Sequence, residues 1–337
     1  MAVSTLIAIS FCIALFILGW YISYMDWEVR HALHYETLLT AARGSEAKAD
    51  QAFDTAKEIL DLNERFDQNY AHYAKLLDVD ISVVRAAYEH NVRAFGTLQG
   101  KIWVISRDSE LWPKQVSMFA YIPRFLYAQG DVSLLKQPIV SVIGTRSPSL
   151  EGRKLAYESA LALGKANFVV ASGLALGIDA IAHKSVLSEG HKTIAVIGTP
   201  LNQTYPAEHK DLQKIIAEQG VVVSRFGPAT QTQKFHFLLR NRLMSALSLA
   251  SVVVEDRDGG GAVRQASFAL EQKRLLFFYQ QSVDNNAVLW PRQFMGKERV
   301  FVIKKPNQLP TAITKAVKGI QSATKEQQKI QQLELFD

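Results

Sequence analysis

Short hydrophobic runs rich in β-branched and aromatic residues alternate with amphipathic stretches through most of the chain after residue 138. Each run has the length of a buried strand, and each intervening stretch is long enough for a helix. The predicted strands are 139–143, 168–171, 193–197, 221–224, 251–255, 275–279 and 300–303. The predicted helices are 150–166, 178–189, 207–219, 238–249 and 261–273. This alternation predicts an α/β fold with a doubly wound, mostly parallel sheet and helices on both faces.

The amino end has a different pattern. No side chain before Asp26 is charged, and the apolar run is long enough to cross a bilayer as one helix. Aromatic residues gather at its far end, where the interfacial belt of a membrane helix lies. We therefore expect a transmembrane anchor at 1–25; a buried helix and a cleavable signal peptide are the alternatives. Arg30 and His31 follow the run, so the positive-inside tendency places the body in the cytoplasm.

Residues 26–96 form a polar, helical region without proline. Its apolar residues recur at alternating steps of four and three, which would form a heptad-like seam along a helix. The pattern holds only if Glu46 is included in that seam, and several of its members are alanine. A strong coiled coil is therefore disfavoured, and a helix or helical hairpin packed on the body is expected. The seam comprises Tyr35, Leu39, Ala42, Ala49, Phe53, Ala56 and Leu60.

Residues 71–90 have the spacing of a helix-turn-helix. Ala74 and Leu77 would lie on the first helix and Val84 on the second, with Asp78 in place of the usual turn glycine. DNA reading by this segment and a purely structural helical subdomain are both open.

Residues 97–305 are expected to form one domain. Before the first sheet run, IWVIS at 102–106 predicts a short strand. Pro113, Pro123 and Gly130 predict turns and an extended approach into the sheet.

Composition narrows the chemistry. The net charge is +6 and the pI about 9.2, which permits nucleic acid or anionic lipid as a partner. The one cysteine, Cys12, supplies no disulfide framework, zinc cluster or thiol nucleophile. The sequence has no paired carboxylates, no HExxH and no Walker lysine, so we expect no enzyme activity, metal or cofactor. Gly144 is not followed by a G-x-x-G turn, which disfavours NAD.

Four clusters follow predicted strands, where the fold would bring them to one edge of the sheet. They comprise Gly144, Thr145 and Arg146; Ser172, Gly173, Leu174, Ala175 and Gly177 with Asp179; Lys234, Phe237, Arg240, Asn241 and Arg242; and Gly260 and Gly261 within Asp258–Ala262. Small residues at helix starts leave N–H groups for phosphate, and a guanidinium can bind phosphate through two parallel hydrogen bonds. Cations beside aromatic rings are typical of single-strand binding.

Each cluster also has an ordinary structural interpretation. Asp179 can cap its helix or orient Arg146. Phe237 can be a core residue, and Arg240 and Arg242 can pair with Glu255 or Asp256. His183 and His236 are expected to be structural, because no nucleophile stands at an elbow turn to use them.

Taken together, the four clusters resemble the DprA/Smf family of bacterial DNA-processing (DNA recombination-mediator) proteins, from about Trp112 to Tyr279. The matching segments, in family order, are YIPRFLYAQGDVSLL, VSVIGTRSPS, ASGLALGIDAIAH, TIAVIGTPLNQTYPAEHKDL, HFLLRNRLMSALSLASVVVE and GGGAVRQASFALEQKR. The resemblance implies an extended Rossmann-like fold that binds single-stranded DNA without sequence preference. It also implies a homodimer that hands the DNA to a RecA-type recombinase.

The resemblance assigns roles by position. Arg146 and the loop 172–177 would hold phosphate, Lys234 would hold the DNA backbone, and Phe237 would stack on a base. Arg240 and Arg242 would line the pocket. With the predicted anchor, this gives a single-pass protein of the bacterial inner membrane acting in DNA processing, recombination or DNA uptake. The alternative is a sensor or hydrolase of a small nucleotide in the same crevice, for example in phage defence.

A polar helical tail is expected at 306–337. Its end resembles the QLxLF-type peptide that docks on the replicative sliding clamp, through Gln332, Leu333, Leu335 and Phe336. Apolar side chains on a solvated tail need a pocket, which peptide-in-groove recognition supplies. The alternative is a frayed helix end packed on the body.

Overall fold

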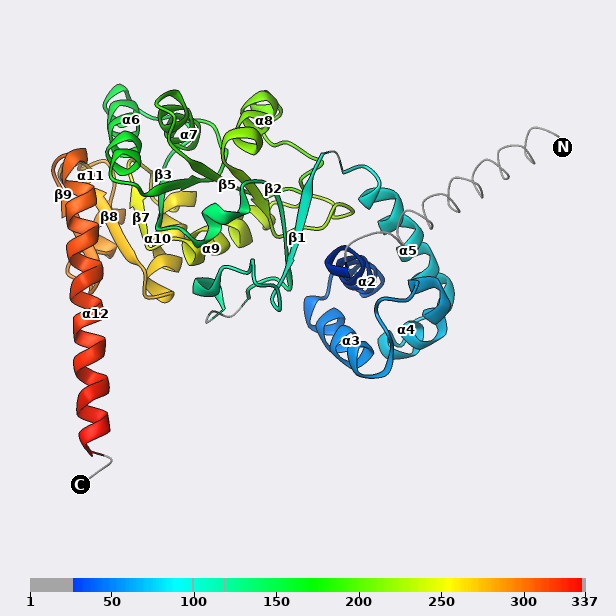
Figure 1. Cartoon of the computed structure of the whole chain (residues 1–337). Helices are drawn as coiled ribbons and strands as arrows, with labels where there is room; N and C mark the ends of the chain where they lie inside the picture. The colour runs from blue at the N-terminus through cyan, green and yellow to red at the C-terminus, as the bar shows by residue number, and fades with distance from the viewer. Residues whose placement is uncertain (1–26, 99, 118, 120, 335–337) are drawn as a thin grey trace.

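The structure is a computed structural model that describes residues 27–98, 100–117, 119 and 121–334, with the backbone alone over 323–334 (Figure 1). The anchor predicted at 1–25 lies outside the described residues and stays a prediction. The same holds for Leu335 and Phe336 and for the side chains of Gln332 and Leu333, so the predicted clamp peptide is not described either. Within the described ranges, no helix has the length and apolar character needed to span a membrane.

The described strands form one nine-stranded sheet in the order β1-β2-β6-β5-β4-β3-β7-β8-β9. From β6 to β9 all neighbours pair in parallel, and β1–β2 and β2–β6 are antiparallel. The predicted, mostly parallel α/β sheet is confirmed, with every predicted strand present within two residues at each end. The strands are β1 (Ile102–Ser106), β2 (Phe125–Gly130), β3 (Ile139–Ile143), β4 (Val169–Ser172), β5 (Thr193–Ile197), β6 (Val221–Ser224), β7 (Ala250–Val253), β8 (Leu275–Tyr279) and β9 (Val300–Ile303).

Strand β2 was not predicted: its residues were expected only to approach the sheet. Phe125 and Tyr127 belong to one buried cluster, and Leu126 and Ala128 to another, so β2 is buried on both faces. Pairing with β1 and β6 supplies its backbone partners. A strand buried on both faces has no polar alternation, and Pro123 and Gly130 at its two ends look like turn signals in the sequence.

Helices cover both faces of the sheet (Figure 1). Helices α6, α7 and α8 lie on one face, with the first turns of α12, and α9 and α10 lie on the other. The longer helices are α6 (Leu150–Lys165), α7 (Ile178–Ser188), α8 (Lys210–Gln219), α9 (His236–Leu247), α10 (Gly261–Glu271) and α12 (Leu309–Glu334). The short ones are α11 (Gln280–Asp284) and the 3₁₀ turns η1 (Phe66–Asn69), η2 (Lys114–Val116), η3 (Val132–Lys136), η4 (Ala207–His209), η5 (Trp290–Gln293) and η6 (Pro306–Gln308).

The amino-terminal region is a bundle of helices beside the β1 edge of the sheet (Figure 1). It comprises α2 (Trp27–Ala41), α3 (Glu46–Ile59), α4 (Tyr70–Leu77) and α5 (Ile81–Phe95). The first two form a helical hairpin, one of the two expected forms, because Arg43 and Gly44 have φ of 54° and 82° and interrupt the heptad-like seam. The last two have the expected helix-turn-helix form, with Asp78 left-handed at the turn. DNA reading by this pair stays a prediction.

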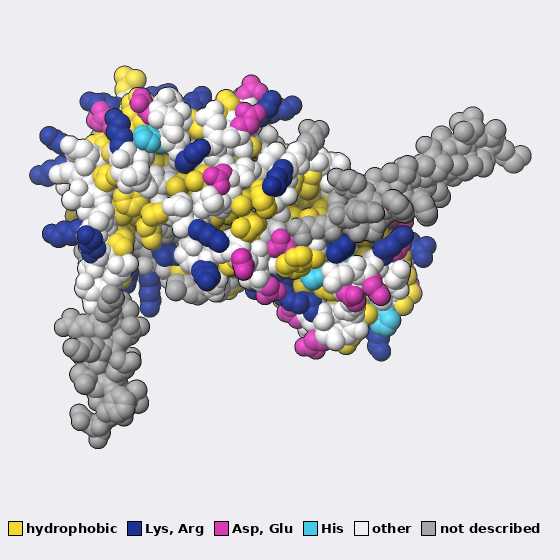
Figure 2. Space-filling view, viewed as in Figure 1, with side chains coloured by type: hydrophobic (Ala, Val, Ile, Leu, Met, Phe, Trp, Pro, Cys, Tyr) yellow, Lys and Arg dark blue, Asp and Glu magenta, His cyan; other side chains and the backbone are white. Residues whose placement is uncertain are grey.

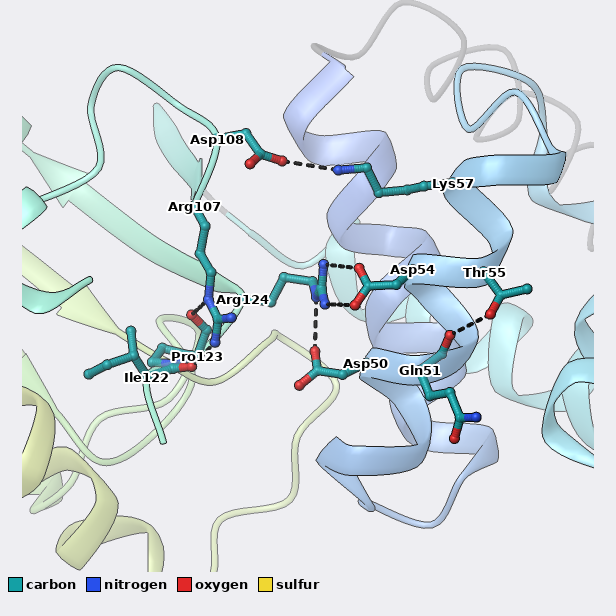
Figure 3. A network of polar contacts seen from close by, with 10 residues as sticks. All are labelled: Asp50, Gln51, Asp54, Thr55, Lys57, Arg107, Asp108, Ile122, Pro123 and Arg124. Carbon is teal, nitrogen blue, oxygen red and sulfur yellow. Dashed lines mark hydrogen bonds and ion pairs between the residues drawn. The ribbon is translucent and has the colours of Figure 1, made fainter. Parts of the chain in front are cut away.

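Polar and aromatic contacts hold this bundle to the sheet, and Figure 3 shows the ion pairs of Arg124 and Lys57 among them. The Arg124 guanidinium donates to Asp50 at 2.9 Å and to Asp54 at 2.8 Å, and it lies 4.9 Å from the centre of the Phe53 ring. The buried Tyr127 hydroxyl donates to Glu36 Oε1 at 2.7 Å. We call these contacts, together with the Arg225–Glu46 and Lys57–Asp108 ion pairs, the bundle joint.

Candidate functional site at the strand ends

The strand order reverses at β3, which pairs with β4 on one side and β7 on the other. In open α/β sheets, ligands bind beyond the carboxyl ends of the strands at such a switch point. A cavity of about 610 Å³ lies there, and a smaller one of about 40 Å³ adjoins it. The two cavities share Arg146, Ala175, Phe237 and Arg240. We call both cavities together the crevice.

The loop after β3 is fixed by its neighbours. A Cβ at Gly144 would lie 2.7 Å from the Glu255 carbonyl oxygen, so this position has no room for a side chain. The Thr145 N–H donates to that same carbonyl at 2.7 Å, and the Thr145 carbonyl accepts from Ile178 N–H at 3.2 Å. Gly144, Thr145 and Arg146 all line the larger cavity, and Arg146 is exposed there.

The loop after β4 is engaged mostly with the protein itself. Ser172 Oγ donates to the Val142 carbonyl at 2.7 Å, and Leu174 is fully buried. The N–H groups of Gly173 and Ala175 donate to Asp179 Oδ2 at 3.1 and 3.4 Å. These two donors, which the sequence offered to a phosphate, are therefore already bound by a carboxylate.

Gly177 and Gly173 permit close approach in this loop. Gly177 has φ of 77°, and a Cβ there would lie 2.4 Å from the Thr145 carbonyl oxygen, so the loops after β3 and β4 touch. Neither Gly177 nor Ser172 lines the crevice, whereas Ala175 lines both cavities and Gly173 lines the smaller one. A Cβ at Gly173 would overlap the guanidinium of Arg240, which packs against it.

Arg240 is 5% exposed, and its Nη1 donates to the Val196 carbonyl at 3.0 Å. Burial raises the pKa of Asp179, while Arg240 and the loop N–H groups act in the opposite direction. Asp179 thus organises its own loop beside Arg240; of the two roles that the sequence left open for Asp179, orientation of Arg146 is not observed. The alternative pairing of Arg240 with Glu255 or Asp256 is not observed either.

Aromatic rings lie beside Arg146. The Phe237 ring packs over Gly198, where a Cβ would lie 2.7 Å from it. The centre of that ring is 5.1 Å from the Tyr205 ring at 53°, and the Arg146 guanidinium carbon is 6.0 Å from the Tyr205 ring centre. Phe237 is half-buried in the crevice rather than a core residue. Sequence reasoning missed Tyr205, which is 48% exposed; an aromatic residue in a polar loop was the available signal.

Of the other predicted residues on α9 and in the loop before it, some line the crevice and some do not. Asn241 lines the larger cavity and donates to the Gly261 carbonyl at 3.2 Å. Lys234 is exposed but lines neither cavity.

Arg242 does not line the crevice, contrary to what the resemblance implied. It forms an ion pair with Glu271 at 2.5 Å and lies 4.7 Å from the Phe268 ring centre. Because successive helical residues are about 100° apart, a step of two from Arg240 reverses the direction of the side chain.

The turn before α10 carries Gly260 and Gly261, and both line the larger cavity. Asp256 Oδ2 accepts from the N–H groups of Ala262 and Val263 at 2.9 and 3.1 Å. Burial raises the pKa of Asp256, and these donors oppose that effect. The predicted phosphate nest is thus already partly filled by the protein's own carboxylate.

The larger cavity is nevertheless electropositive. Its lining includes Arg146, Arg240, Arg257 and Arg264, against the carboxylates of Asp179 and Asp256 only. Both carboxylates are buried and accept backbone hydrogen bonds. Sequence reasoning missed Arg257 and Arg264, which lie on either side of the predicted glycine turn. Within the described ranges, no group of three or more His, Cys, Asp or Glu residues could hold a metal ion. This chemistry suits an anion.

Comparison with known families agrees with this geometry. The family described as DNA recombination-mediator protein A matches residues 103–309. Among curated relatives, DNA processing protein DprA of Streptococcus pneumoniae is 37% identical over 174 residues, or 52% of this chain and 61% of that protein. Protein Smf of Escherichia coli is 31% identical over 207 residues, or 61% of this chain and 55% of that protein. The match thus spans little more than half the length of these relatives.

Solved structures extend the likeness beyond sequence. The crystal structure of DprA from Streptococcus pneumoniae has a TM-score of 0.67 and 27% identity, covering 82% of this chain and 96% of that one. DprA from Helicobacter pylori has a TM-score of 0.57 and 28% identity, covering 64% and 96%. The second structure is described as giving insight into a single-stranded DNA binding mode of that protein.

Proposed function

This chain belongs to the DNA recombination-mediator protein A family, and on that basis we propose that it binds single-stranded DNA in the crevice at the strand ends. The observation that carries the proposal is the juxtaposition of Arg146, Phe237 and Tyr205 at the boundary between the two cavities. The single-stranded DNA binding described for the Helicobacter pylori relative supports it.

The chemistry of these groups fits a single strand. A base can stack on the exposed faces of Phe237 or Tyr205, which is sequence-tolerant because every base has a π face. The Arg146 guanidinium lies beside the rings and can bind the adjoining phosphate through two hydrogen bonds. The buried charge of Arg240 raises the potential behind them. No group in this set acts as a nucleophile or a metal ligand, so we propose a binding role without catalysis.

The first test is oligonucleotide binding by Arg146→Ala and Phe237→Ala. Loss of one stacked base corresponds to about 1–3 kcal/mol, so Phe237→Ala should weaken binding roughly five- to 150-fold. Arg146→Ala should also flatten the dependence of affinity on salt, by about 0.7 in log–log slope for one phosphate. Tyr157→Ala, which removes a 44% exposed ring on α6, is the matched control.

Unchanged affinity in both variants, or binding that ignores salt, contradicts the proposal. Mononucleotides serve as competitors in the same assay. If a mononucleotide binds as tightly as a long oligonucleotide, the alternative of a small-nucleotide sensor or hydrolase is favoured instead.

The wider cellular role follows from the same premise. We propose that the bound strand is passed to a RecA-type recombinase in DNA processing or uptake, by a homodimer held at the cytoplasmic face of the inner membrane. The family membership supports the recombination part of this role. Only the sequence pattern supports the proposed membrane anchor and the proposed clamp-docking peptide.

A further inference from the structure

The larger cavity continues past Arg146 to residues that the role just proposed does not use. Tyr205 lines only the smaller cavity, whereas Arg257 and Arg264 line only the larger one. Arg257 follows β7, and Arg264 lies in the first turn of α10. The crevice therefore has an aromatic end at Tyr205 and a second end at Arg257 and Arg264, where Asp256 also lines the cavity, with Arg146 shared between them; we call the second the cationic end.

The two arginines of the cationic end are available for a ligand. Both side chains are exposed, and neither guanidinium makes a hydrogen bond or ion pair with a described residue. At the start of α10 the N–H groups of Ala262 and Val263 are taken by Asp256, which reduces the backbone donors available to an anion and leaves a larger part to side chains. The guanidinium Nε of Arg240, which lines the same cavity, is buried without a hydrogen-bond partner among the described residues.

The separation of the two strands that precede these ends sets the scale of the ligand. Tyr205 follows β5, and Arg257 follows β7, with β4 and β3 between them in the sheet. Three inter-strand spacings amount to about 14 Å. A strand that rises at least about 3.4 Å per nucleotide would cover this span with at most about four nucleotides.

We propose that Arg257 and Arg264 form a second phosphodiester subsite, which holds the bound strand a few nucleotides away from a base stacked at the Tyr205 end of the crevice. The inference rests on the proposed single-strand binding and gives it a direction across the sheet, from β5 toward β7. Because the subsite contacts phosphate alone, it is indifferent to base identity.

The test measures binding of oligothymidylate probes of two, four, six and ten nucleotides to the full-length protein across a salt titration. The variant is Arg257→Gln/Arg264→Gln. The matched control, Lys165→Gln/Lys273→Gln, removes the same charge from exposed side chains next to the carboxyl ends of α6 and α10, at the opposite edge of the sheet.

The subsite predicts a length-dependent loss. The variant should bind the dinucleotide as the unmodified protein does, and should lose about tenfold or more on the hexanucleotide. Its salt slope on the hexanucleotide should fall by about 1.4, or about 0.7 for each phosphate no longer neutralised.

An equal loss at every length, an unchanged salt slope, or the same loss in the lysine control overturns the subsite. Failure of the proposed function gives a different result, because the unmodified protein would then bind no oligonucleotide of any length. If Arg146→Ala and Phe237→Ala weaken binding while Arg257→Gln/Arg264→Gln does not, single-strand binding stands and the second subsite is rejected.

Discussion

The arginines of the bundle joint and those of the crevice have opposite surroundings. Arg124 and Arg225 have side chains that are 14% and 2% exposed, and both are paired with carboxylates of the bundle. Arg146, Arg257 and Arg264 are exposed and form no ion pair with a described residue. The first pair of arginines therefore joins the sheet domain to the bundle, whereas the second set is exposed to solvent.

The charge of the two regions explains this division. Residues 26–96 carry 13 acidic and 8 basic side chains, whereas residues 97–337 carry 19 acidic and 30 basic ones. Basic side chains are spread over the visible face of the sheet domain (Figure 2). The acidic bundle neutralises only the part that it covers. The modest net charge of the whole chain thus conceals a strongly basic body, which favours a polyanionic partner.

The largest effect on the free energy of unfolding is expected at Glu36. This carboxylate belongs to the bundle joint, and its hydrogen-bond donor is the uncharged Tyr127 hydroxyl. Burial raises the pKa of Glu36 to about 7 from an ordinary 4.5. Between these values the folded protein keeps a proton that the unfolded chain has released, so stability falls as pH rises. We expect Glu36→Gln to remove this loss, on the order of 3 kcal/mol by pH 8.

Chemical denaturation of the unmodified protein and of Glu36→Gln at pH 4.5 and pH 8 measures this difference in the pH dependence of stability. Burial also lowers the pKa of His34 and His183 to about 3, which makes stability fall toward low pH, but both proteins share that effect. Parallel stability profiles for the two proteins would show that Glu36 is ionised in the folded state.

The next largest loss of stability is expected for Arg124→Ala. Arg146→Ala should have the opposite profile, with a loss of affinity and no loss of stability. Removing the Arg124 guanidinium deletes hydrogen bonds to Asp50 and Asp54 and a contact with the Phe53 ring. Because both carboxylates are partly exposed, the loss should be about 2 kcal/mol of unfolding free energy, with affinity for oligonucleotides retained. A binding defect in Arg124→Ala would show that the joint and the crevice are coupled.

The smallest effect is expected at the exposed end of the same joint. The side chains of Lys57 and Asp108 are 40% and 70% exposed, although their atoms are 3.1 Å apart (Figure 3). Solvent and salt screen such pairs, so Lys57→Gln should change the free energy of unfolding by less than about 0.5 kcal/mol. A loss comparable to that of Arg124→Ala would mean that burial does not set the strength of the joint.

Much of the fold could be predicted because its signals are local. Buried runs such as 139–143 and 193–197 are strands because their hydrophobicity has no competing period, and the glycine turns after them end each strand. Of the helix or helical hairpin predicted for this region, the hairpin α2–α3 forms, and it turns at Arg43 and Gly44. The strand β2 was missed because its pairing partners, not its sequence period, make it a strand.

The candidate site was predicted in outline and missed in detail. Arg146 could be identified because it follows a recognisable strand end, and Phe237 because it stands among basic residues and matches the family by position. Arg242 was wrongly assigned to the crevice because it points away from Arg240 on α9. Tyr205 was missed because it stands in a loop without hydrophobic periodicity. Asp256 was one alternative ion-pair partner for Arg240 and Arg242, but it accepts hydrogen bonds from the first turn of α10 instead.

The sequence by itself determined the order of strands and helices, the buried faces and the glycine-lined strand ends, because hydrophobic period and turn chemistry act within a few residues. Only the tertiary structure decided which donors and arginines remain free for a ligand. Asp179 takes the loop N–H groups, and Glu46, 179 residues away, takes Arg225. Such pairings depend on how distant segments pack, and no local pattern records them.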